Sequence, residues 1–296
     1  MSCLISIIIP TRNRIEVLSS CLMLLNKQSF PLSDIEVVLV DDGSQVPVEA
    51  RCKELPLNYA LKIIRNNTPF GPAYARNRGL EIASGEVILF IDDDILAPSE
   101  FLENHFLLQQ KKEKVIVRGP IIDIPYGDIT SAPPPRLWNF SMNSFCTSNV
   151  SVKKKYLLEA GGFDTLFRWW EDSELGLRLK KAGLTKVFSF KAFVYHYKPF
   201  PKTANFIWKK LIEDASEKAK SANIYLSKHP MLSVRLKTGI YKLNFLQVKI
   251  FVNPLLLKIY KKILFNSSYP YWLRKLCYQF IFSYYYVKEL QKMECA

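Results

Sequence analysis

The sequence predicts an α/β fold in which a mostly parallel β-sheet is covered by helices on both faces. Uninterrupted apolar runs recur in the first hundred residues, as expected of strands that are buried on both sides. Segments with apolar residues at helical spacing separate these runs. Two of the runs end in acidic residues, at the strand ends where open α/β sheets bind their ligands.

The first hundred residues supply most of the expected sheet. We expect strands over 4–10, 34–44, 60–67 and 86–91, the second of them ending in acids and a turn, and helices over 14–29 and 72–85. Pro10 stops the first apolar run because it lacks a backbone donor. Pro72 near the start and Gly85 near the end of the second helix are typical helix boundaries.

The second hundred residues are more irregular. We expect a semi-extended loop over 125–136, where three consecutive prolines exclude a helix or a central strand. A strand over 144–152, a short helix over 156–164, a helix over 171–183 and a β-like segment over 186–198 follow. Beyond Pro201 the pattern is helical to the end.

Charge divides the chain into two regions. From Lys202 to the end there are 17 Lys+Arg and five Asp+Glu, so this part carries +12 of the net charge of +14. We therefore expect one domain over 1–200 and a basic, aromatic-rich helical region over 201–296.

The cysteines and the N-terminus indicate the compartment. The six cysteines are single, without a CxxC pair, which excludes zinc ribbons and thioredoxin-type redox sites. The first apolar run is too short for a signal peptide. We expect a cytoplasmic protein, in the cytosol or peripheral on a cytosolic membrane face.

Three adjacent carboxylates, Asp92, Asp93 and Asp94, follow the apolar run over 87–91. If the strand continues, Asp92 and Asp94 share one face about 7 Å apart and Asp93 lies on the other. Two charges at that distance repel by roughly 2 kcal/mol. A hard divalent cation such as Mg²⁺ or Mn²⁺ reverses that repulsion. The alternative is a solvated acidic loop.

Three further features have both a functional and a structural interpretation. Asp42 lies in an acidic turn that could be a simple Asx-type turn. Glu171 and Asp172 begin a helix, where acids also serve as caps. The tryptophans before them could stack on sugar rings or pack in a core. His196 follows a β-like run and could complete an oxygen-rich metal site or be structural.

Four segments in order, "SIIIPTRNR", "VDDGS", "ARNRGLEIASGEVILFIDDDI" and "GGFDTLFRWWEDSELGLRLKKAG", resemble the family 2 glycosyltransferases of the GT-A fold. The resemblance covers about residues 4–200. It implies a Rossmann-like sheet with a nucleotide-sugar half over about 1–95, an acceptor half over about 96–200, and a basic helical C-terminal extension.

The resemblance also implies roles for particular residues. Nucleotide-sugar binding falls on Pro10, Thr11, Arg12, Asp42, Arg76, Asp93 and Asn149. Asp92, Asp94 and His196 match the metal site, with Asp93 on the ribose. Asp172 matches the general base, beside Glu171.

The implied reaction is inverting sugar transfer from a nucleotide-sugar, by default a UDP-sugar, to a hydroxyl of a glycan or lipid-linked acceptor. It needs Mn²⁺ or Mg²⁺ to stabilise the nucleoside diphosphate that leaves. A positioned carboxylate takes the proton of the incoming hydroxyl. The implied setting is cell-surface polysaccharide or glycoconjugate synthesis by an enzyme of the hexosyltransferase type.

Two alternatives stay open. One is a sugar nucleotidyltransferase, although no glycine-rich loop follows the first strand. The other is an inactive GT-A scaffold that docks on membranes. A dinucleotide-binding oxidoreductase is excluded because no GxGxxG follows a strand.

The sequence of the C-terminal region predicts amphipathic helices. Its uncharged stretch over 276–287 is shorter than the roughly 20 residues a membrane-spanning helix needs. The helices are expected either to lie on an anionic membrane surface or to pack on the first domain or in a dimer. No nucleic-acid partner is expected.

Overall fold

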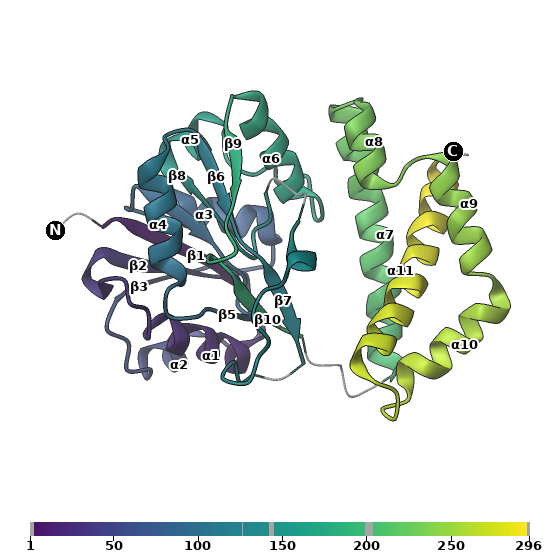
Figure 1. The fold of residues 1–296 in the computed structure, drawn as a ribbon, viewed down its shortest axis with the longest axis horizontal. Coiled ribbons are helices and arrows are strands. Elements are labelled where there is room, and N and C mark those ends of the chain that lie inside the picture. The colour runs from purple at the N-terminus through teal and green to yellow at the C-terminus, as the bar shows by residue number, and fades with distance from the viewer. Residues whose placement is uncertain (1–2, 126, 142–144, 199–203, 295–296) are drawn as a thin grey trace. The chain divides into compact units, whose positions relative to one another are not determined.

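The computed structural model describes residues 3–125, 127–141, 145–198 and 204–294. It divides into two compact units (Figure 1). The sheet unit comprises Met1–Thr165 and Glu171–Pro199, and the helical unit comprises Leu166–Trp170 and Phe200–Ala296. The domain boundary predicted between residues 200 and 201 lies outside the described residues.

The sheet unit is built on a seven-stranded sheet with the order β3–β2–β1–β4–β8–β6–β9. Its strands are β1 (Ile5–Thr11), β2 (Ile35–Asp41), β3 (Ala60–Arg65), β4 (Val87–Phe90), β6 (Val115–Arg118), β8 (Val150–Lys153) and β9 (Thr185–Phe188). The pairs among β3, β2, β1 and β4 are parallel, as are β6 and β9. Only β8 runs antiparallel to its neighbours β4 and β6 in this sheet. The prediction of a mostly parallel sheet is confirmed.

Helices cover both faces of this sheet, because successive side chains of each strand point to opposite faces. Ile7 of β1 packs with the buried faces of α1 and α4, whereas the next residue, Ile8, packs with those of α3, α5 and α6. These helices are α1 (Ile15–Leu25), α2 (Glu49–Lys53), α3 (Pro72–Ile82), α4 (Phe101–Lys111), α5 (Lys154–Glu159) and α6 (Glu171–Lys181), with short 3₁₀ turns at Leu32–Asp34 and Leu137–Asn139.

A second, three-stranded sheet brings distant parts of the chain together. Its strands are β5 (Ile95–Leu96), β10 (Val194–Tyr197) and β7 (Ile121–Ile124), in the order β5–β10–β7. His196 of β10 pairs with Ile95 on one side and with Asp123 on the other. The backbone amide of Tyr197 also donates to the carbonyl of Asp94 over 2.9 Å. This register places His196 beside both Asp94 and Asp123.

The helical unit consists mainly of five helices in the described part of the chain. They are α7 (Ala204–Lys228), α8 (Leu232–Thr238), α9 (Lys242–Phe251), α10 (Pro254–Phe265) and α11 (Tyr271–Glu294). Small residues of α7, such as Ala215 and Ala219, let it approach Tyr286 of α11 closely. Leu257 of α10 packs with Ile281 of α11. The predicted helical extension is confirmed, and no described helix is both long and apolar enough to cross a bilayer.

Several elements differ from the sequence-based expectations. The helices α2 and α4 and the strands β6 and β7 were not predicted. The strand expected over 144–152 begins only at Val150, because 147–149 form a turn and bend. Strand β4 ends at Phe90, so the three carboxylates lie in the turn between β4 and β5 and not on a strand.

Candidate active site

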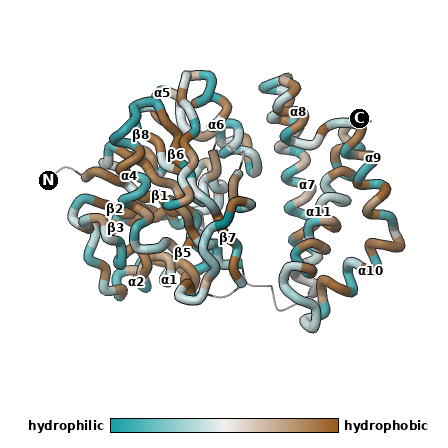
Figure 2. The backbone as a smooth tube through the Cα atoms, viewed as in Figure 1, coloured by the Kyte–Doolittle hydropathy of each residue, from teal (hydrophilic) through white to brown (hydrophobic). Residues whose placement is uncertain are grey.

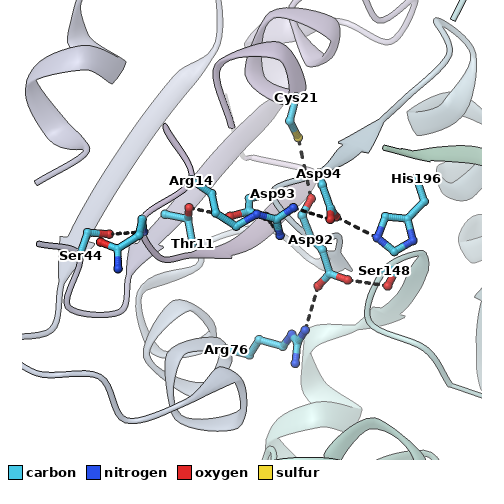
Figure 3. Close-up of polar contacts among 11 residues, drawn as sticks. Thr11, Arg14, Cys21, Ser44, Arg76, Asp92, Asp93, Asp94, Ser148 and His196 are labelled. Carbon is cyan, nitrogen blue, oxygen red and sulfur yellow. Dashed lines mark hydrogen bonds and ion pairs between the residues drawn. The ribbon is translucent and has the colours of Figure 1, made fainter. Parts of the chain in front are cut away.

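The polar residues of interest gather where three neighbouring parallel strands end. Thr11 is the last residue of β1, Asp41 the last of β2, and Asp92 follows β4 closely. The carboxyl ends of parallel strands meet at one edge of a sheet, which is where such sheets bind ligands. Figure 3 shows the side chains of Thr11, Asp92 and their partners converging there.

The three carboxylates divide differently from the strand-based prediction. Asp93 and Asp94 both contact Arg14, whereas Asp92 points away from them. Both oxygens of Asp92 are occupied, Oδ1 by Arg76 at 2.9 Å and Oδ2 by the hydroxyl of Ser148 at 2.5 Å. The pairing of Asp92 with Asp94 on one face was wrong, because alternation of faces holds for a strand and not for this turn. Asp92 is thus placed as a bridging residue in the structure, and its predicted role as a metal ligand is not favoured.

Arg14 lies across the other two carboxylates. Its Nη1 is 2.8 Å from Asp93 Oδ1, and its Nη2 is 2.7 Å from Asp94 Oδ2. Burial raises the pKa of Asp93 to about 7, although Arg14 and the hydroxyl of Thr11 oppose the shift. Burial also acts on Asp94, but His196 and Arg14 outweigh it and lower its pKa to about 2. Asp94 is therefore ionised at neutral pH.

Arg76 joins the two acidic motifs inside the sheet unit. It lies on α3, is buried, and contacts Asp92 and Glu171 at 2.9 Å each. Its guanidinium also lies over the ring of Phe163. Burial works to lower the pKa of Arg76, but the two carboxylates outweigh it, so the pKa is raised. Burial raises the pKa of Glu171 in turn. The ion pairs fix the start of α6 relative to the turn after β4.

His196 lies between two carboxylates, as its strand register requires. Its Nδ1 is 3.2 Å from Asp123 Oδ1, and its Nε2 is 3.1 Å from Asp94 Oδ1. Burial works to lower the pKa of His196, but Asp123 and Asp94 outweigh it and the pKa is raised. The contact to Asp94 lacks hydrogen-bond geometry, so Asp94 Oδ1 is buried without a hydrogen-bond partner. An unsatisfied buried carboxylate oxygen normally has a cation or water as its missing partner.

These residues fit a divalent cation that is held jointly by the protein and a ligand. Within the described part of the chain, no three His, Cys, Asp or Glu side chains are gathered closely enough to hold a metal ion alone. Asp94 and His196 form a pair instead. Mg²⁺ commonly takes one or two carboxylates and completes its shell with substrate phosphates and water. The pair therefore suits an ion that arrives with a phosphorylated ligand.

Asp172 is placed beside the same cluster. It is partly exposed near the start of α6, and its Oδ1 accepts a hydrogen bond from the amide of Ser173. Its carboxylate acts electrostatically on two buried arginines, Arg76 and Arg118. Burial lowers the pKa of Arg118, and Asp172 partly offsets that effect. A carboxylate that is partly exposed can be reached by a bound hydroxyl and can take its proton.

Three further residues, Asp42, Pro10 and Arg12, were predicted to bind the nucleotide-sugar. Asp42 accepts hydrogen bonds from the side chain of Asn66 and from the amides of Phe70 and Gly71. It thus holds the loop before α3, and its contact with a base stays a prediction. Pro10 lies on β1 and Arg12 is exposed in the turn after it, so their roles also stay predictions.

Asn149, also predicted to bind the nucleotide-sugar, is held by hydrogen bonds inside the sheet unit. Its side chain is fully buried. Its amide nitrogen donates to the carbonyls of Pro120 and Ala192, and its oxygen lies 2.9 Å from His105 Nε2. Its contact with the sugar stays a prediction. Asn149 joins β8 to its surroundings.

The two tryptophans before Glu171 belong to the helical unit. Trp170 donates from Nε1 to the carbonyl of Lys218 over 3.2 Å, and the amide of Trp169 donates to the hydroxyl of Ser221. Trp170 also packs at the α7–α11 core. The structure therefore favours core packing over sugar stacking for this pair. Trp170 has a positive φ of 69°, which is rare for a bulky residue.

Sequence reasoning missed three residues of the site. Arg14 was visible in "PTRNR", but nothing local indicates that it reaches Asp93 and Asp94. Ser148 lies in the turn before β8, a region that we expected to be strand. Asp123 lies on β7, which had not been predicted, and its pairing with His196 joins residues that are far apart in the sequence.

Comparisons with known proteins agree with this architecture. The family model described as glycosyl transferase family 2 matches residues 6–198. The uncharacterized glycosyltransferase YfnE of Bacillus subtilis is 26% identical over 246 residues, and the match covers 61% of this chain and 61% of that protein. The chain thus spans about three fifths of this relative's length.

Two solved structures share the fold. The mannosyltransferase PcManGT of Pyrobaculum calidifontis, in complex with GDP-Man and Mn²⁺, has a TM-score of 0.62 at 19% identity, over 97% of this chain and 87% of that one. Residues 1–349 of S. aureus TarS in complex with UDP-GlcNAc have a TM-score of 0.60 at 17% identity, over 98% and 91%. At these identities the likeness shows the fold alone, and it confirms the predicted GT-A architecture. The family model, which covers most of the chain, shows more: this chain belongs to glycosyl transferase family 2.

Proposed function

We propose that the protein is a metal-dependent, inverting glycosyltransferase that moves a sugar from a nucleotide-sugar to a hydroxyl of a glycan or lipid-linked acceptor. The observation that carries the proposal is the buried Asp94 Oδ1, which has no hydrogen-bond partner and faces His196 Nε2 at 3.1 Å. Two structural neighbours support it, since one is a complex with UDP-GlcNAc and the other with GDP-Man and Mn²⁺. A UDP-sugar is the default donor.

Asp94 and His196 would hold the cation, Mn²⁺ or Mg²⁺. When bound, the cation supplies Lewis acidity that stabilises negative charge on the leaving nucleoside diphosphate. Asp123 positions His196, because its carboxylate lies 3.2 Å from Nδ1 on one side of the ring while Nε2 faces Asp94 on the other. Arg14 is partly exposed at the same edge, and its planar guanidinium suits the oxygens of a diphosphate.

The rest of the donor would lie along the ends of β1, β2 and β4. We assign the turn Pro10–Arg12 to the nucleotide, Asp93 to the ribose and Asp42 to the base. Asp42 can make that contact only if the loop it now holds adjusts, because its oxygens accept three hydrogen bonds from the chain. The division into a donor half over 1–95 and an acceptor half over 96–200 is part of the same proposal.

Asp172 is the proposed general base. It takes the proton of the acceptor hydroxyl as the oxygen forms a bond to the anomeric carbon. The bond between that carbon and the diphosphate oxygen breaks on the opposite face, so the anomeric configuration inverts. Glu171 and Arg76 keep Asp172 in place by fixing the first turn of α6.

The proposed setting is polysaccharide or glycoconjugate synthesis at the cytosolic face of a membrane. The basic helical unit would provide a peripheral attachment there, because +12 of the net charge of +14 lies from Lys202 onward. Attachment would bring the catalytic groups near a lipid-linked acceptor.

A donor screen tests the proposed activity. UDP-, GDP- and dTDP-sugars are incubated with the protein and Mn²⁺, and release of the nucleoside diphosphate is measured. We expect one nucleotide class to be hydrolysed, and the signal to vanish when the cation is chelated. Folded protein that hydrolyses no donor, with or without a glycan acceptor, would contradict the proposal.

A further inference from the structure

The helical unit has an extreme distribution of charge. The 71 residues from Lys218 to Lys288 contain 13 Lys+Arg and no Asp or Glu. The helices α8, α9 and α10 all lie within this stretch. Because no acid lies in this stretch, Lys249 of α9 and Lys258 of α10 have no acidic neighbour on their own helices.

The helices α9 and α10 are apolar on two sides. Val248 of α9 and Leu257 of α10 pack into the core of the helical unit. Further apolar residues on the same helices are exposed, and Figure 2 shows both helices largely in the colour of hydrophobic residues. A surface helix of a globular protein normally has a single apolar stripe that faces the core, so further exposed apolar residues indicate a second contact surface.

These exposed residues form what we call the outer face. It consists of Leu243, Leu246, Ile250 and Phe251 of α9, Leu255 and Ile259 of α10, and Trp272 and Leu276 of the first turns of α11. Leu255 is 69% exposed and Trp272 is 65% exposed. Exposed lysines, Lys249 and Lys258, lie among them in the sequence of the same helices. Most of these apolar residues recur three or four positions apart, so within each helix they lie on one side. Exposed apolar side chains arranged in this way are typical of a binding surface.

We propose that the outer face rests on an anionic lipid bilayer. This inference deepens the membrane attachment included in the proposed function by naming the surface that makes it. Leucine and isoleucine side chains enter the acyl boundary, and Trp272 suits the interface between headgroups and chains. The lysines contact anionic headgroups.

The charge distribution favours lipid over a second copy of the chain. A second copy would bring another acid-free, basic surface against the first, and like charges across an interface repel. An anionic bilayer complements both properties of the outer face, its apolar side chains and its cations.

Vesicle sedimentation with the full chain tests the inference. Two vesicle types are compared, phosphatidylcholine alone and equal parts of phosphatidylcholine and phosphatidylglycerol, each at low and high salt. We expect binding to the anionic vesicles that weakens at high salt, since screening reduces the attraction. The double variant Leu255→Ser/Ile259→Ser should reduce the partition coefficient by about tenfold or more, because it removes two inserting side chains.

A matched control distinguishes this surface from exposed apolar residues in general. Leu107→Ser/Leu158→Ser removes two leucines of comparable exposure from α4 and α5 of the sheet unit, and it should bind vesicles as the parent does. Equal losses in both variants, equal binding to neutral vesicles, or recovery only in the supernatant would overturn the inference. So would sedimentation-velocity data in which the parent is a dimer and the Leu255→Ser/Ile259→Ser variant a monomer.

Failure of the inference is separable from failure of the proposed function. Vesicle binding is measured without donor, and donor hydrolysis is measured without vesicles. The serine variants lie outside the catalytic residues, so both should hydrolyse a soluble donor as the parent does.

Discussion

The two units of this chain differ in where their charged residues lie and in how these are balanced. In the sheet unit, Asp93, Asp94 and Arg76 are buried and form ion pairs. In the helical unit, a long stretch has cations and no acids, and leucines and tryptophan lie exposed. Buried and paired charges create a site with defined protonation states, whereas an excess of cations beside exposed apolar side chains suits an anionic partner. The sheet unit therefore carries the candidate active site, and the helical unit carries the proposed membrane-binding surface.

The largest expected effect concerns the base in the sheet unit. Asp172→Asn keeps the shape and the capping oxygen but removes the basicity. Turnover should fall by roughly 10²–10⁴, the usual contribution of a positioned base. Nucleotide binding and melting temperature should remain close to those of the parent. Asp34→Asn, in the 3₁₀ turn before β2, is the control and should leave turnover unchanged. A lower melting temperature with normal turnover would assign Asp172 to helix capping alone.

Removing a buried cation from the sheet unit should destabilise it strongly. Arg76→Met leaves Asp92 and Glu171 without their shared partner, and the free energy of unfolding should fall by roughly 3–5 kcal/mol. The matched change Arg51→Met, on α2, breaks an exposed pair with Glu54 just after that helix and should cost at most about 1 kcal/mol. Urea unfolding measures both. Similar losses would mean that burial does not distinguish these charges.

The interior of the sheet unit should also give a pH-dependent stability. Burial lowers the pKa of His105 to about 4, from an ordinary value of 6.5. The unfolded chain therefore binds more protons than the folded one between these values, and stability should fall as the pH drops from 6.5 to 4. The loss approaches about 1.4 kcal/mol per pH unit within the window. His105→Gln should flatten the dependence of melting temperature on pH in this range. An unchanged slope would show that His105 is not the group responsible.

The smallest effect is expected in the helical unit, where one cation is held by aromatic rings. The ammonium of Lys218 lies between 4.9 and 5.9 Å from the ring centres of Trp169, Trp170, Phe282 and Tyr286. Lys218→Met should lower the free energy of unfolding by about 1 kcal/mol, since cation–π contacts at partly exposed sites are worth about that much. Lys220→Met, two residues further along α7, should change it little. A larger loss than for Arg76→Met would reverse the comparison between the units.

How much of this could be predicted from the sequence differs by residue. The fold and the sheet edge followed from local signals, because the apolar runs and the acids after them lie within short segments. The side chain that each acid contacts could not be predicted, because these contacts join residues that are distant in the sequence. Asp92 was grouped with Asp94 on the assumption of a continuing strand, yet β4 ends at Phe90. Asp123 was missed because β7 and its pairing with β10 left no local signal.

In the helical unit, too, local signals could not predict contacts between segments that are distant in the sequence. Its charge and its helical spacing were visible in the sequence, but which apolar residues pack inside and which lie outside was not. Val248 and Ile250 are two residues apart on α9, and only the second is exposed. The neighbouring helices that decide this come from sequence positions well removed from α9.

The central claim is that Asp94 and His196 bind a divalent cation together with the donor diphosphate. Calorimetric titration of UDP, with and without Mn²⁺, into the parent and into Asp94→Asn tests it most directly. The parent should bind UDP much more tightly in the presence of Mn²⁺, because the described residues offer the ion too few protein ligands to bind strongly alone. The variant should lose this metal-dependent gain and keep its fold by circular dichroism. UDP binding that is equally tight in both proteins, or indifferent to Mn²⁺ in the parent, would contradict the account.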